Sequence, residues 1–75
     1  MTKAKLHLTF PEHFVSEPVV HRVGAEFGLV TNIHRANLDE RGGWVILEVE
    51  GDDELVAAAT AWLADQGLQI DRIDG

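Results

Sequence analysis

Cysteine is absent from this sequence of 75 residues, and its absence excludes several kinds of chemistry. Without thiols the chain cannot form disulfides, bind zinc through thiolates or ligate an iron–sulfur cluster with its own side chains. A domain this short buries only a modest share of its surface, so it must gain stability from packing alone or from self-association. We expect residues 1–75 to form a single domain without a cofactor.

Positive charge and long apolar runs are also scarce. Lys and Arg number 6 against 13 Asp and Glu, which gives a net charge of −7 at pH 7. An acidic surface repels phosphates and anionic lipids, so we expect no nucleic acid as a partner. No apolar run approaches the roughly 20 residues that cross a bilayer, and the N-terminus lacks the apolar segment of a signal peptide. We therefore expect a cytoplasmic location and no membrane insertion.

Two stretches carry the amphipathic pattern of helices. Residues 16–28 begin with Ser16 as a helix cap and end at Gly28, which suits the left-handed position after a helix. Residues 52–66 begin with acidic side chains that complement the helix dipole. The expected apolar stripes are Val19, Val20, Val23 and Phe27 in the first helix and Leu55, Val56, Ala59, Trp62 and Leu63 in the second.

Four further stretches have the features of strands. Apolar and polar residues alternate in the first and third, which predicts one buried face for each. Pro11 ends the first strand because it has no N–H to donate. Turn-forming residues at 39–43 join the second and third strands as an antiparallel hairpin. The four expected strands are residues 4–10, 29–38, 44–50 and 68–73.

The resulting order, β-α-β-β-α-β, predicts an α+β fold, the ferredoxin-like sandwich of a four-stranded antiparallel sheet with two helices on one face. Right-handed crossovers place both helices on the same side, so the other face of the sheet stays open. Alternation assigns His7, Thr9, Trp44, Ile46 and Glu48 to this open face and, with Ile33 facing the helices, Asn32, His34 and Ala36 as well.

Trp44 and Ile46 form an apolar patch on the expected open face, with His7 beside them. Such a patch often marks an interface, although scattered apolar residues on a surface are also normal. Because this small domain has no disulfide or metal, we favour self-association. The predicted interface residues are Trp44, Ile46 and His7, in a homodimer that buries this face or pairs an edge strand.

Motifs of catalysis and metal binding are missing. The four histidines lack the close spacing of metal ligands, so we interpret them as ordinary surface residues. His7 and His34 could share the open face. The single serine, Ser16, is explained as a cap, and no glycine-rich phosphate loop follows a strand. We therefore expect no enzymatic activity, no catalytic residue and no metal site.

Asn32 and Asn37 interrupt the second strand. Asparagine is depleted in strands because its side chain competes for backbone hydrogen bonds. A bulge or an early turn near Asn37 explains that residue. Asn32 is either an exposed polar residue of an edge strand or a ligand contact, since its amide both donates and accepts hydrogen bonds.

The stretch VTNIHRANLDERGGWVILEVEG, followed by a helix with AWL and then Gly-Leu-Gln-Ile, resembles the NIL domain. That family occurs at the C-terminus of methionine-import ABC transporter ATPases and at the N-terminus of some ferredoxins. The TFPE opening, the EP before the first helix and WVILEVEG are most similar to the ferredoxin-associated and stand-alone members. The family's Asn-Ile-Leu falls on Asn32, Ile33 and His34, with histidine in place of leucine, and the hairpin is shorter than in the transporters.

The resemblance implies a regulatory domain that binds methionine and dimerises. We expect a stand-alone domain that senses methionine or a related amino acid as a homodimer. Asn32 would hold the polar group of the ligand, and Ile33 and His34 would shape the pocket. The alternative is a protein-interaction module that docks through its open sheet face or an edge strand onto a partner in sulfur metabolism or redox chemistry.

Overall fold

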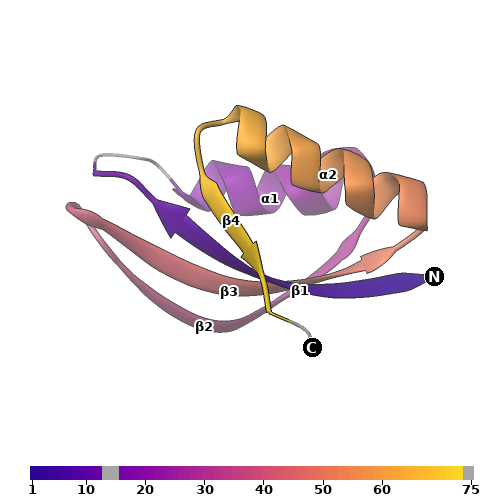
Figure 1. Ribbon diagram of the computed structural model, residues 1–75, viewed down its shortest axis with the longest axis horizontal. Coiled ribbons are helices and arrows are strands. Elements are labelled where there is room, and N and C mark those ends of the chain that lie inside the picture. Colours follow the sequence, from indigo (N-terminus) through magenta and orange to yellow (C-terminus); the bar gives the residue numbers. More distant parts are fainter. Residues whose placement is uncertain (13–15, 74–75) are drawn as a thin grey trace.

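The computed structural model describes residues 1–12 and 16–73, and Figure 1 shows two helices on one side of a sheet. The sheet has four antiparallel strands in the order β2-β3-β1-β4. This arrangement confirms the predicted α+β ferredoxin-like fold. The elements are β1 (Thr2–Phe10), α1 (Ser16–Phe27), β2 (Val30–Asp39), β3 (Gly42–Gly51), α2 (Asp53–Asp65) and β4 (Gln69–Arg72).

The ends of the elements lie close to the predicted ones. β1 begins two residues earlier than expected and stops directly before Pro11, where the ladder would lose a donor. Asp52 is the residue before α2, and Asp53 and Glu54 place negative charge in its first turn. The predicted capping by Ser16 concerns a side chain outside the described part of the chain.

A two-residue turn joins β2 and β3, so the loop predicted at residues 39–43 is too long. The carboxylate of Asp39 accepts a hydrogen bond of 2.8 Å from the backbone N–H of Arg41 and stabilises the turn. Gly43 already belongs to β3 and has a φ of 146°. A Cβ atom there would lie 1.9 Å from the carbonyl oxygen of Asn37, so only glycine fits this close approach.

The hydrophobic core lies between the helices and the covered face of the sheet. Leu8, Leu47 and Leu63 are fully buried at its centre. Each such side chain contributes about 1.5–3 kcal/mol of transfer free energy, and no described polar side chain is buried among them. The buried apolar residues are Ala4, Leu6, Leu8, Phe10, Val19, Val23, Leu29, Val45, Leu47, Val49, Val56, Ala59, Leu63 and Leu68.

The second helix corrects one core prediction. Leu55 is 38% exposed, whereas Val56, Ala59 and Leu63 are buried. One residue is a rotation of about 100° along a helix, so Leu55 falls on the rim of the stripe, on the same side as the half-buried Trp62. The described helices, of 12 and 13 residues, are not long and apolar enough to cross a membrane.

Candidate functional site

The sheet face opposite the helices is uncovered in the single chain (Figure 1). Residues paired across antiparallel strands project from the same face, so the register identifies which side chains lie there. Leu6 pairs with Leu47, and both are buried against the helices. The next pair, His7 with Ile46, therefore faces away, as does Trp44 further along β3. The register places the three predicted interface residues together, and their role as an interface stays a prediction.

An aromatic stack occupies the middle of the open face. The rings of His7 and Trp44 lie 5.6 Å apart between centroids, with an interplanar angle of 22°. Ile46 pairs with His7 in the register of β1 and β3, and all three residues are half-buried. Such stacked rings keep a defined position on the surface. They offer a flat apolar contact to the side chain of a ligand or to a partner protein.

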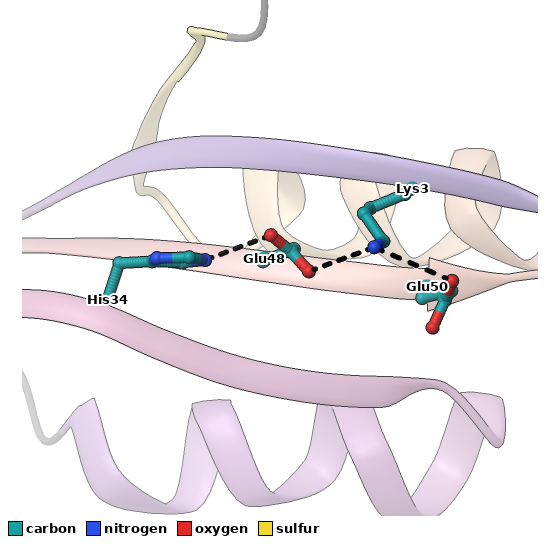
Figure 2. A network of polar contacts seen from close by, with 4 residues as sticks. All are labelled: Lys3, His34, Glu48 and Glu50. Carbon is teal, nitrogen blue, oxygen red and sulfur yellow. Dashed lines mark hydrogen bonds and ion pairs between the residues drawn. The ribbon is translucent and has the colours of Figure 1, made fainter.

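A polar network lies on the same face (Figure 2). Glu48 of β3 holds Oε1 at 2.9 Å from Nε2 of His34 on β2 and Oε2 at 3.8 Å from Nζ of Lys3 on β1. Lys3 also lies 4.0 Å from Glu50. The side chain of Glu48 is only 20% exposed, against 60% for Lys3. The network links three strands and fixes the Glu48 carboxylate near the centre of the open face.

A β-bulge interrupts β2 at His34. Ile33 and Arg35 pair with successive residues of β3, so His34 between them has no partner in the register. This extra residue reverses the alternation of the strand. Arg35 therefore lies on the open face, while Ala36 pairs with the buried Val45 and turns to the helix side. The prediction that Ala36 lies on the open face is wrong for this reason.

The three predicted ligand-binding residues lie on different sides of β2. Asn32 pairs with Glu48 in the register of the strands and so faces the open side, and the ring of His34 contacts the Glu48 carboxylate there. Ile33 points to the helix side but is 51% exposed, because β2 is an edge strand with a neighbour on one side only. The prediction of an Ile33 anchored beneath the helices is therefore wrong. The irregularity expected near Asn37 lies three residues earlier.

Sequence reasoning missed Arg35 as an open-face residue, although a signal for it exists. Ile33 and Leu38 are both apolar, and both project to the helix side of β2. They are five positions apart, an odd spacing that strict alternation cannot accommodate. One inserted residue between them restores the match, and this places the bulge within residues 34–37.

A concave region of about 740 Å³ lies on the helix side, between α2 and the edge formed by β1 and β4. It exists because β4 pairs with only four residues of β1 and because small side chains, Ala57, Ala61 and Ala64, line the helix wall. A hydrogen bond from Thr2 to Asp53 lies at its rim. None of the predicted site residues lines this cleft. Among the described residues, no three His, Asp or Glu side chains gather as a metal site.

Comparison with known proteins points to one family. A family model described as the NIL domain matches residues 4–72. The methionine import ATP-binding protein MetN of Haemophilus ducreyi is 30% identical over 74 residues, and the match covers 93% of this chain and 22% of that protein. The chain thus spans less than a quarter of that relative's length.

A solved structure resembles the whole fold. It is the crystal structure of the C-terminal domain of an ABC transporter ATP-binding protein from Enterococcus faecalis, with a TM-score of 0.80 and 17% identity. The match covers 96% of this chain and 84% of that one. At this level of identity the likeness shows a shared fold.

Proposed function

This chain belongs to the NIL domain family, and we propose that it is a cytoplasmic regulatory domain, without enzymatic activity, that binds a small amino acid as a homodimer. The observation that carries the proposal is the grouping of Asn32 and His34 around Glu48 on an uncovered sheet face. The relative from Haemophilus ducreyi is named for methionine import, which favours methionine or a related amino acid as the ligand.

The open face supplies the two kinds of contact that such a ligand needs. The amide of the exposed Asn32 can donate to a carboxylate or accept from an ammonium group. Ile46 and the His7–Trp44 stack lie further along the same face and suit an apolar side chain. A thioether makes favourable contacts with aromatic rings, which adds a reason to prefer methionine over an aliphatic amino acid of equal length.

A second copy of the chain would complete the site. A flat sheet face encloses a small ligand poorly, whereas pockets usually bury most of the ligand surface. Pairing through the edge of β2, or face to face, would cover the open side. Ile33 then contributes at the rim, where its half-exposed side chain can contact the partner copy or the ligand.

The ligand can be tested by titrating L-methionine and L-homocysteine into ¹⁵N-labelled protein. We expect shifts of the Asn32 side-chain amide and the Trp44 indole N–H, and Asn32→Ala should weaken binding about tenfold or more. Asn37→Ala is the matched control, because Asn37 occupies the same face of β2 beside Trp44. Equal loss in both variants would remove Asn32 from the site, and no shift with either amino acid would contradict the proposal.

The oligomeric state needs a separate measurement. Sedimentation equilibrium should give the mass of a dimer at micromolar concentration. Such an affinity requires an interface that offsets the loss of rotational and translational freedom. Trp44→Ser should weaken the dimer if the open face is buried in it. A monomer at high micromolar concentration would contradict the homodimer.

A specific observation also favours the second candidate, a module that docks onto another protein. The half-buried His7–Trp44 stack lies next to Ile46, in the way that aromatic side chains anchor many interfaces. Under this reading Trp44→Ser abolishes capture of a protein partner and leaves amino-acid binding unchanged. Under the first reading the same variant weakens methionine binding.

A further inference from the structure

We infer that Glu48 and Arg35 bind the two charged groups of a free amino acid, with Glu48 on the ammonium group and Arg35 on the carboxylate. This inference rests on the proposed function and deepens it, because it assigns the residues that bind the two charged groups of the ligand. It is carried by the bulge at His34, which brings Arg35 to the open face, and by the position of the Glu48 carboxylate.

The register places the two side chains within reach of one ligand. Glu48 is two residues from Ile46 along β3, and Ile46 pairs with Arg35. Glu48 and Arg35 are therefore diagonal neighbours, whose Cα atoms lie about 7–8 Å apart in an antiparallel sheet. Both side chains are long, so their ends can lie on either side of the main-chain atoms of an amino acid.

Glu48 keeps capacity for a further donor. One carboxylate oxygen contacts His34 and the other contacts Lys3, at 2.9 and 3.8 Å. An ionised carboxylate has about four lone-pair positions, so two remain for an ammonium group. The contacts to His34 and Lys3 hold the carboxylate in place, which reduces the entropy that binding would cost.

Arg35 has the complementary property. It makes no ion pair within the described part of the chain, and its side chain is exposed. A guanidinium group binds a carboxylate through two parallel hydrogen bonds, which fixes the orientation of the ligand. Without the bulge, alternation would put this residue on the helix side, so the insertion at His34 brings this cation to the site.

The apolar end of the ligand then lies on Ile46. Residues two apart on a strand are separated by about 6.6 Å, so an ammonium group at Glu48 puts a side chain of three to four atoms over Ile46. Its tip reaches the edge of the stack formed by His7 and Trp44. An unbranched side chain of the length of methionine matches this spacing, and glycine or alanine leaves Ile46 uncovered.

Calorimetric titration of the full chain with L-methionine and two blocked derivatives tests the inference. N-acetyl-L-methionine lacks the ammonium group and L-methionine amide lacks the carboxylate. We expect Glu48→Gln to weaken the binding of L-methionine about ten- to a hundredfold and to leave the binding of N-acetyl-L-methionine unchanged. Arg35→Gln should weaken the binding of L-methionine to a similar extent and leave the binding of L-methionine amide unchanged.

Two control variants separate a specific contact from a change in net charge. Glu54→Gln removes an exposed carboxylate in the first turn of α2, and Arg41→Gln removes an exposed guanidinium in the hairpin turn. Both should bind L-methionine within about twofold of the wild type, and thermal unfolding checks that every variant is folded.

The outcomes distinguish this inference from the proposed function. If the wild type binds L-methionine and the variants Glu48→Gln and Arg35→Gln bind it equally strongly, the inference is overturned and the proposed function stands. Equal weakening of blocked and free methionine by the same variants also overturns it. A wild type that binds neither L-methionine nor L-homocysteine overturns both.

Discussion

The two faces of the sheet differ in the polarity and in the burial of their side chains. The helix face is apolar in its buried positions, and no described polar side chain is buried there. The open face carries a network of Lys3, His34, Glu48 and Glu50 and a stacked pair of rings. Neighbouring residues of one strand thus experience different environments. We infer that one face supplies the stability of the domain and that the other is available for recognition.

The contrast shows how this chain, which has no cysteine, combines an apolar core on one face of the sheet with polar groups on the other. Burial of apolar area is non-directional, so the buried positions of the helix face need apolar side chains but no special geometry. Recognition needs charges and rings in fixed positions, and on the open face the ladder of β1, β2 and β3 fixes them.

The largest effect should come from Leu8, which lies on the helix face of β1 and is fully buried. Leu8→Ala removes buried methyl groups and leaves a cavity, so we expect a loss of about 3 kcal/mol in the free energy of unfolding. His7→Ala, one residue earlier on the opposite face, should cost less than about 1 kcal/mol. Urea denaturation measures both, and equal losses would show that the two faces share the stability.

Substitution in the hairpin of β2 and β3 should lower the free energy of unfolding by nearly as much. Gly43→Ala places a Cβ atom against the carbonyl of Asn37, which no side-chain rotation can relieve, and should cost about 3 kcal/mol. Gly67→Ala is the control, because Gly67 also has a positive φ of 94° but no atom within 4 Å of the added Cβ. It should cost about 1–2 kcal/mol. A smaller loss at Gly43 than at Gly67 would mean that the turn rearranges.

The sequence predicted the helix face far better than the open face, and the reason is physical. Apolar periodicity identified nearly all of the core, since burial depends on residue type. It failed at Leu55, where a stripe has a rim, and at Ile33, where an edge strand has no neighbour to cover it. It also failed at Ala36, because one inserted residue changes the face of every residue after it.

The candidate site on the open face could be predicted only in part. Asn32 stands out because asparagine is unusual in a strand, and His34 because the family resemblance places it beside Asn32 and Ile33. The network around Glu48 depends on cross-strand register and on the conformation of Lys3, for which a single sequence gives no signal. Contacts that depend on which residues face each other across strands can therefore be identified only from a structure.

The polar network should contribute much less to stability than the core. Lys3→Gln removes both ion pairs of Lys3, and we expect a loss of about 0.5 kcal/mol, since partly exposed pairs contribute little. The loss should vanish near 1 M NaCl, where charges are screened beyond about 3 Å. Lys5→Gln is the control, because Lys5 pairs in register with Glu48 but makes no ion pair with it. A larger effect at Lys5 would contradict the geometry of the network.

The smallest effect should come from an ion pair on α1, which is more exposed than the network on the sheet. Arg22 donates a hydrogen bond to Glu26 one turn later and lies 4.8 Å from the ring of Trp62. The hydrogen bond from Arg22 lowers the pKa of the Glu26 carboxyl. Desolvation opposes this effect, and the positive charge of Arg22 lowers the pKa further.

Because the pKa of Glu26 is lower in the folded state than in the unfolded chain, its contribution to stability is present above the unfolded pKa and is lost as the pH falls through the folded one. The side chains of Arg22 and Glu26 are about half exposed, so solvent screening makes this contribution small, and the direct measurement is an NMR titration of the Glu26 carboxyl. Arg22→Gln should move that pKa upward toward the ordinary value of a glutamate. An unchanged pKa at Glu26 would mean that Arg22 makes no lasting contact with it in solution. The open face would then carry the ion pairs that persist, because there the strands hold both partners in place.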